Sequence, residues 1–292
     1  MNISAINHFF SLQNLSLQLF HFTLLIFFSS SYALNSSSEL RWAEQLRDNI
    51  VIGEPVDLSI ASADKTQNTF FAIFTEPATA SAKGAVVLMH GMGAHPDWID
   101  IIHPLRAALP DKGWASLSIQ LPLIANHENN NADQDKQQRQ QAIKASVARV
   151  DSAIKFLRAK KYDYIVLLSH SFGSLMAVNY LQLKAEQKTP QGSPIVNAAI
   201  IIGTPSSGMS APLNSSTMLK KIHIPMLDLY GSQDIDSVLR SAKARKTAAN
   251  QAQNKFFRQV QIIGANHFFQ GLDDELISYV SNWLDKTYHL PQ

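Results

Sequence analysis

One short segment, residues 164–177, constrains the fold more than any other part of the chain. Its first five residues are apolar or β-prone without polar alternation, which predicts a buried strand. After Gly173, apolar residues recur at helical spacing. Ser169 and Gly173 lie two positions before and after Ser171, and such small residues let the backbone reverse sharply. The pattern predicts a strand, a tight turn that exposes Ser171, and a helix whose N-terminus favours negative charge.

Along the rest of the chain, predicted strands alternate with predicted helices. Further strands are predicted at 56–60, 69–75, 85–89, 114–119, 198–202, 225–230 and 258–263. Helices are predicted at 40–47, at 98–109 with a kink or break expected at Pro104, and at 142–159, 237–249 and 273–284. This alternation indicates an α/β fold, with a doubly wound, mostly parallel sheet of about eight strands flanked by helices. The first two strands are expected to form an antiparallel hairpin at one edge.

Two polar segments are expected to lie outside regular structure. Residues 35–38 are predicted to be a linker before the first helix. Residues 126–141 are dominated by Asn, Gln and charged residues and are predicted to be a loop, at most a mobile rim over a site. This loop is too short for a large cap domain. We therefore expect residues 34–292 to form a single domain.

The N-terminal segment resembles a secretory signal peptide. Residues 15–28 are dense in Leu, Phe and Ile, small residues follow up to Ala33, and the first charged residue is Glu39. The apolar run is short for a membrane span. The region before it has no Lys or Arg, which departs from the usual signal-peptide pattern. We predict that residues 1–33 are removed after Ala33 and that the protein is periplasmic or secreted. The alternative is an uncleaved leader that anchors the chain in the inner membrane.

Composition excludes several classes of protein. The 292 residues include no cysteine, so there is no disulfide, no thiolate metal site and no cysteine nucleophile. Hydrophobic residues make up 46% and charged residues 16%, which is enough to build a full core. The net charge is only +2, and the basic run 243–246 is best interpreted as the solvated face of a helix. No nucleic-acid partner is expected.

Reactive residue types follow several of the predicted strands. The loops beyond the carboxyl ends of parallel strands share one edge of a sheet, so residues distant in sequence can meet there. The residues at four such ends are the loop of His90, Gly91, Met92 and Gly93, and then Ser171, Asp234 and His267. A serine hydroxyl needs a base to take its proton, and an imidazole, with an ordinary pKa of about 6.5, is suited to this. We expect His267, after the last strand, to be that base, and His90 and His170 to be structural.

The imidazole in turn needs a carboxylate that fixes its tautomer and stabilises its charged form. Asp234 follows the strand at 225–230 after a short turn and is the favoured candidate. Two alternatives remain open. Asp236 is expected to cap the helix at 237–249. Asp228 lies within the strand and, if buried, would need a partner of its own.

Attack on an acyl carbon creates an oxyanion, which a pair of preorganised backbone amides can stabilise. We expect one amide from Phe172, next to the serine, and the other from Met92 in the glycine-containing loop. His90, Gly91 and Gly93 would support that loop. A glycine-rich turn after a strand can instead hold phosphate, but neither the Gly-Lys-Ser/Thr nor the Gly-x-Gly-x-x-Gly pattern is present here.

The turn around Ser171, the His-Gly-x-Gly loop and the order Ser, Asp, His together resemble the α/β-hydrolase superfamily over roughly residues 50–290. The leader and the segment 264–269 are similar to uncharacterised exported bacterial members. The resemblance implies that Ser171 is a nucleophile, Asp234 an acid and His267 a base, with the amides of Met92 and Phe172 as oxyanion donors. The sequence departs from the family at Ser169, where glycine is usual.

We therefore expect a serine hydrolase that needs no metal or other cofactor and cleaves small-molecule or polymer-borne carboxylic esters. Substrate contacts are expected from Trp98, Phe172, Phe268 and the loop 203–209. Two alternatives remain. One is a non-catalytic binding protein with this fold, and the other is a peptidase, thioesterase or acyltransferase that uses the same residues.

Overall fold

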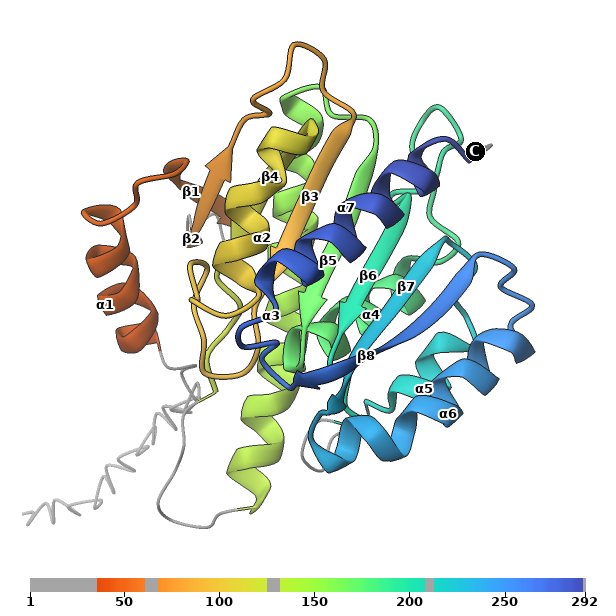
Figure 1. Ribbon diagram of the computed structural model, residues 1–292. Coiled ribbons are helices and arrows are strands. Elements are labelled where there is room, and N and C mark those ends of the chain that lie inside the picture. The colour runs from red at the N-terminus through yellow and green to blue at the C-terminus, as the bar shows by residue number, and fades with distance from the viewer. Residues whose placement is uncertain (1–35, 61–67, 125–131, 208–212, 291–292) are drawn as a thin grey trace, which may run out of the picture. The chain divides into compact units, whose positions relative to one another are not determined.

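The centre of the structure is one eight-stranded sheet with the strand order β1-β2-β4-β3-β5-β6-β7-β8 (Figure 1). The strands are β1 (Glu54–Ile60), β2 (Asn68–Thr75), β3 (Gly84–Met89), β4 (Trp114–Ile119), β5 (Ile165–His170), β6 (Ala198–Ile202), β7 (Met226–Gln233) and β8 (Phe257–Asn266). β2 pairs antiparallel with both β1 and β4, and all the other pairs are parallel. The predicted sheet and the hairpin at its edge are confirmed.

The computed structural model describes residues 36–60, 68–124, 132–207 and 213–290. All of the described helices and strands belong to one compact unit within residues 32–292. The predicted leader, residues 1–33, lies outside the described residues. So do residues 126–131 of the predicted loop and residues 208 and 209 of the predicted substrate-contact loop.

Helices cover both faces of the sheet. They are α2 (Ile102–Ala108), α3 (Ala132–Ala159), α4 (Phe172–Lys184), α5 (Ser215–Leu219), α6 (Asp236–Gln251) and α7 (Asp273–Tyr288). Val86 and Leu88 of β3 pack in one apolar cluster with residues of α2 and α7, which lie in front of the sheet in Figure 1. Val87 and Met89 point the other way and pack with residues of α3, α4, α5 and α6. Because helices cover both faces, the central strands are apolar along most of their length, without the polar alternation of a half-exposed strand.

Helix α1 (Ser36–Arg47) lies apart from these two layers, beside the hairpin of β1 and β2. It buries Ala43 against Phe71 and Ile73 of β2, and the partly buried Leu46 and Ile50 complete this small cluster. The helix includes residues 36–38, so the prediction of a linker there is wrong. Serine at the start of a helix is common because its side chain can satisfy free backbone amides.

Helix α3 begins at Ala132, so the prediction of a loop over residues 132–141 is also wrong. Five of these ten residues are Gln, and Ala132, Lys136 and Arg139 are also good helix formers. It has few apolar residues at helical spacing, and for that reason the pattern indicated no helix. The described residues contain no large cap domain over the sheet.

Helix α2 begins at Ile102, four residues later than predicted, and is followed by the short 3₁₀ helix Pro110–Lys112. Pro104 lies in the first turn of α2, where backbone N–H groups have no partner within the helix. The helix therefore continues through Pro104 without the expected kink or break, because proline in the first turn removes no helical hydrogen bond.

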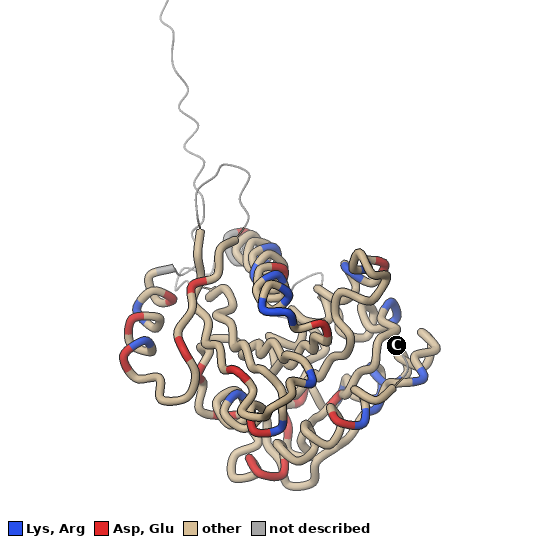
Figure 2. Tube along the Cα trace, turned by 90° about the horizontal axis from the view of Figure 1, so that it is seen from above, with Lys and Arg blue, Asp and Glu red and all other residues tan. Residues whose placement is uncertain are grey.

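Charged residues are distributed without strong segregation. Acidic and basic residues are interspersed over the described chain in Figure 2. Among the described helices, none is both long enough and apolar enough to cross a membrane.

Candidate active site

The turn between β5 and α4 has the geometry that its small residues predict. Ser171 has φ 53° and ψ −118°, a strained conformation for a residue other than glycine. A Cβ atom at Gly173 would lie 2.5 Å from two backbone oxygens at the end of β3, so only glycine fits there. Ser169 is buried, and its hydroxyl donates to the carbonyl of Ile200 in β6 at 3.2 Å. Serine is therefore accommodated where hydrolases usually have glycine.

Three side chains from three different loops form one continuous hydrogen-bonded row. The Oγ of Ser171, after β5, lies 2.9 Å from Nε2 of His267, after β8. The Nδ1 of His267 lies 2.6 Å from Oδ1 of Asp234, after β7. With its proton on Nδ1, the ring donates to Asp234 and accepts from the Ser171 hydroxyl. The carboxylate also accepts from the backbone amides of Gly231 and Ile235, at 3.2 and 2.8 Å, which fix its orientation.

The two alternative carboxylates have other partners. Asp228 is fully buried within β7 and accepts from Nε of Arg245, also fully buried, at 2.8 Å. Asp236 is exposed in the first turn of α6 and pairs with the arginine one turn later at 3.1 Å. The expectation that Asp236 caps this helix is wrong, because the helix begins at Asp236 itself and Ile235 occupies the cap position. Among these three aspartates, the structure brings Asp234 to His267.

His170 contacts His267 directly, a contact that the sequence did not predict. Its Nε2 donates to the backbone oxygen of His267 at 2.9 Å, and the two ring centroids are 4.8 Å apart. Burial lowers the pKa of His170 to about 3, so the ring is neutral. Gly203, after β6, has φ 56°, and a Cβ atom there would lie 3.1 Å from the ring of His267. The ring of His267 is thus enclosed on several sides.

The loop of His90, Gly91, Met92 and Gly93 lies against the turn at Ser171. A Cβ atom added at Gly91 would be 3.4 Å from the Cβ of Ser171. Gly93 has φ 73°, a left-handed conformation that favours glycine. Met92 is exposed, and Phe172 is the buried first residue of α4. Neither backbone amide donates to an acceptor among the described residues, so both predicted oxyanion donors are available.

His90, which is buried, makes hydrogen bonds within this loop and to the segment after β4. Its Nε2 faces the backbone N–H of Leu121 at 2.9 Å and must therefore be an acceptor. The proton is consequently on Nδ1, which donates to the carbonyl of Gly91 at 2.8 Å. Burial lowers the pKa of His90 to about 3, which keeps this neutral form over a wide pH range.

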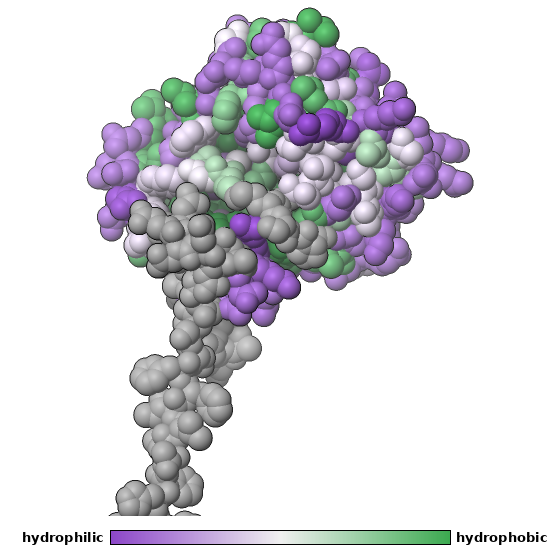
Figure 3. Space-filling view, turned by 90° about the horizontal axis from the view of Figure 1, so that it is seen from below, coloured by the Kyte–Doolittle hydropathy of each residue, from purple (hydrophilic) through white to green (hydrophobic). Residues whose placement is uncertain are grey.

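Three loops at this edge, those that carry Met92, Asp234 and His267, each expose a large apolar side chain. Met92 is 44%, Ile235 46% and Phe268 40% exposed. Phe268 also packs edge-on against His267, with ring centroids 5.2 Å apart. Figure 3 looks onto the edge at which these loops lie, and its uncovered surface mixes pale and green residues with hydrophilic ones. Trp98 is half-buried and contacts His95, with ring centroids 5.2 Å apart.

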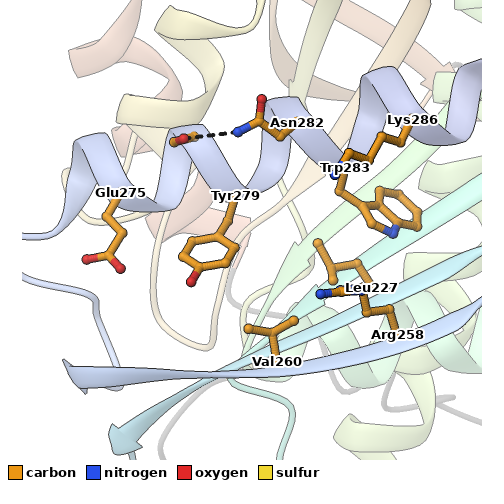
Figure 4. Close-up of a pocket in the computed structure, with 9 residues that line it drawn as sticks. Leu227, Arg258, Val260, Glu275, Tyr279, Asn282, Trp283 and Lys286 are labelled. Atoms are coloured by element: carbon orange, nitrogen blue, oxygen red, sulfur yellow. Dashed lines mark hydrogen bonds between the residues drawn. The ribbon is translucent and has the colours of Figure 1, made fainter.

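Other features of the described residues lie away from this row. A cavity of about 380 Å³ lies between α7 and the strands β7 and β8, with Val260, Tyr279 and Trp283 among its lining residues (Figure 4). None of the predicted site residues lines it. Within the described part of the chain, no group of three or more His, Asp or Glu residues could hold a metal ion.

Solved structures with similar folds are numerous. One is a cold-adapted esterase from an Arctic intertidal metagenomic library, with a TM-score of 0.60 and 16% identity over 80% of this chain and 92% of that chain. Another is an α/β serine hydrolase without a lid from Xanthomonas campestris, with a TM-score of 0.57 and 11% identity over 83% and 98%. A third is a dienelactone hydrolase from Anabaena variabilis, with a TM-score of 0.57 and 18% identity over 80% and 98%. At such identities the likeness establishes the fold alone.

Sequence comparison identifies the family. Among proteins with curated functions, none matches this sequence. A family model described as "Protein of unknown function (DUF3530)" matches residues 43–130 and 124–286, which include the whole sheet and every residue of the row. The chain therefore belongs to the DUF3530 family, and it has the α/β-hydrolase fold.

Proposed function

We propose that this protein is a serine hydrolase that cleaves carboxylic esters through an acyl-enzyme intermediate. The observation that carries this proposal is the row Asp234–His267–Ser171, with separations of 2.6 and 2.9 Å. In it the serine lies at a strained strand-to-helix turn. Such a row gives the serine a base and gives the base a fixed tautomer.

The proposed reaction has two halves. The Oγ of Ser171 attacks the acyl carbon while its proton passes to Nε2 of His267. The bond to the leaving alcohol then breaks, and His267 returns the proton to the leaving oxygen, which leaves the acyl group on Ser171. Water repeats the sequence with the same base and releases the acid. Asp234 stays ionised throughout and stabilises the imidazolium that forms in each half.

Each half passes through an oxyanion, and we assign its stabilisation to the amides of Phe172 and Met92. The Phe172 amide is at the N-terminus of α4, where free N–H groups and the helix dipole favour negative charge. In other serine hydrolases a single donor of this kind contributes on the order of 10²–10³ in kcat. These steps use only side chains and backbone amides of this chain.

The surroundings of the row favour an accessible ester with an apolar part. The exposed side chains of Met92, Ile235 and Phe268 would contact a substrate held at Ser171. Among the described residues no large cap encloses this edge, so the site could accept small esters and also esters carried by a polymer. That some neighbours in fold are named an esterase and a serine hydrolase without a lid supports the same choice.

A fluorophosphonate probe tests the proposal against a non-catalytic binding role. The wild type should be labelled, Ser171→Ala should not be labelled, and His267→Ala should react far more slowly. A well-folded wild type that remains unlabelled would favour the binding role. A panel of chromogenic esters of increasing acyl length, with matched thioesters and peptides, then ranks esterase against thioesterase and peptidase. Added alcohols or amines as acceptors test for acyl transfer.

We also propose that the protein is exported and that residues 1–33 are its leader. The apolar run 15–28 and the small residues up to Ala33 support this proposal. N-terminal sequencing of protein recovered after expression in a bacterium tests it. A mature chain that begins at Leu34 in the periplasm or medium is expected. An intact chain in the membrane fraction would support the anchored alternative.

A further inference from the structure

An unbroken series of polar contacts connects α1 to the loop that follows β3. Glu39 in α1 pairs through Oε2 with Nη2 of Arg149 in α3 at 2.7 Å. The Nη1 of Arg149 donates to the backbone oxygen of Gln120 at 2.8 Å. The side-chain amide of Gln120 lies 3.1 Å from Nε2 of His90, whose Nδ1 donates to the carbonyl of Gly91. The first charged residue of the chain is thus linked to the predicted oxyanion loop.

The links nearest α1 are shielded from solvent. The side chains of Arg149 and Glu39 are only 9% and 11% exposed. Glu39 also accepts from the backbone amide of Leu123 through Oε1 at 2.8 Å, so both of its carboxylate oxygens are used. Removal of its charge would leave the Arg149 guanidinium buried without a counter-ion, which is strongly unfavourable. Arg149 and the segment after β4 would then be free to move.

The far end of the series fixes the orientation of one peptide group. The carbonyl of Gly91 and the N–H of Met92 belong to the same planar, trans peptide unit, so they point in opposite directions. Because His90 holds the carbonyl, it also directs the Met92 amide away from itself. The orientation of a predicted oxyanion donor therefore depends on where the ring of His90 lies. That ring is held in turn by Gln120 and Leu121.

Helix α1 depends on these contacts for its own position. It has 12 residues, and an isolated helix of that length is marginal in water. Its apolar contacts with the sheet form only a small cluster around Ala43. A second contact with the same loop comes from Trp42, whose ring packs edge-on against His95 at a centroid distance of 5.3 Å. Arg47 at the end of α1 also pairs with Asp57 of β1. Few contacts thus hold α1 to the sheet, and two connections couple it to the loop after β3.

We propose that docked α1 is required for a fully competent oxyanion site, and that Glu39 and Arg149 are positioning residues of this enzyme. This rests on the proposed serine-hydrolase function, because it assigns a catalytic consequence to an ion pair outside the row. Undocking of α1, or loss of the Glu39 charge, lets the Gly91–Met92 peptide rotate and weakens stabilisation of the transition state. Ground-state binding of the substrate is affected much less.

Steady-state kinetics with an ester substrate tests the catalytic part. Glu39→Gln should lower kcat by about tenfold, less than loss of a whole oxyanion donor, with KM changed by less than about twofold. Affinity for a trifluoromethyl ketone, whose adduct with Ser171 carries an oxyanion, should fall in parallel. Glu44→Gln is the matched control, because Glu44 is exposed on the same helix and its side chain has no polar contact with another described residue. This control should behave as wild type.

A double-mutant cycle tests whether Glu39 acts through Arg149. In an Arg149→Met background, adding Glu39→Gln should change kcat by less than about twofold, because the link is already broken. If the two substitutions lower kcat independently, so that their fold-changes multiply in the double variant, the proposed route through Arg149 is contradicted. A Glu39→Gln variant that matches Glu44→Gln in both kcat and inhibitor affinity would overturn the proposal outright.

Hydrogen exchange separates failure of this inference from failure of the proposed function. Glu39→Gln should speed backbone exchange in residues 90–98 relative to Glu44→Gln, while the strands of the sheet exchange as in wild type. This measurement needs no substrate. Unchanged exchange in 90–98 shows that α1 does not hold the loop, even in an active enzyme. Faster exchange in a protein that fluorophosphonate does not label supports the coupling and rejects the enzymatic role.

Discussion

Two buried histidines should make the protein unstable in mild acid. Burial lowers the pKa of His90 and of His170 to about 3, whereas each titrates near its ordinary value of about 6.5 in the unfolded chain. Between these values the unfolded state binds more protons than the native state. The contribution of the two histidines to the free energy of unfolding is therefore complete above about pH 6.5. It is lost progressively as the pH falls toward 3.

The size of the effect follows from the number of protons. Each histidine contributes about 1.4 kcal/mol per pH unit inside this window, so the two together contribute about 2.7 kcal/mol per unit. A domain whose whole stability is about 5–15 kcal/mol would lose much of it over two pH units. Substitution by glutamine keeps a polar side chain but removes the titration, so His90→Gln should roughly halve this part of the slope.

Urea unfolding followed by circular dichroism at about pH 7, 6 and 5 measures these slopes. The absolute slope also includes other titrating groups such as His95, whose pKa burial lowers. The difference between wild type and His90→Gln isolates one histidine. Equal slopes in wild type, His90→Gln and His170→Gln would refute the assignment of these rings as neutral, proton-excluding groups.

Three further substitutions test other parts of the structure. Asp234→Asn should lower kcat for ester hydrolysis by about 10⁴, because the carboxylate no longer fixes the tautomer of the His267 ring. Circular dichroism should show that the fold is retained. Near-wild-type turnover would exclude Asp234 as the partner of His267. Gly173→Ala should destabilise the protein by at least about 1–3 kcal/mol, since a Cβ atom there meets backbone oxygen at 2.5 Å, and an unchanged Tm would contradict this. Asp228→Asn should cost about 3–5 kcal/mol in urea unfolding by leaving Arg245 buried without its partner, with kcat per folded molecule unchanged.

The sheet could be predicted because its signals are local. Central strands buried on both faces appear as continuous apolar runs, and the turn at Ser171 needs small residues at fixed positions. The same reasoning placed Asp234 and His267 just beyond strand ends, at the edge where the structure brings them together with Ser171. The carboxyl ends of parallel strands lie at one edge of the sheet, so this convergence can be predicted once the strands are identified.

Other features depend on contacts that no local pattern encodes. Glu39 and Arg149 are 110 positions apart, and nothing in either segment marks them as partners. His170 was expected to be structural from its place in the turn, but its bond to the backbone of His267 depends on how the loop after β8 returns to the site. Residues 132–141 form a helix through intrinsic propensity, which hydrophobic periodicity does not detect.

The most direct test of the proposed chemistry is to trap the acyl-enzyme. The purified protein is mixed with an activated acetate ester, quenched in acid during turnover, digested and analysed by mass spectrometry. An acetyl group should be found on Ser171, while Ser169 and Ser174 in the same segment stay unmodified, and it should accumulate less in His267→Ala. Hydrolysis of the ester at full rate with no acyl group on Ser171, or with the acyl group on another residue, would contradict the proposed mechanism.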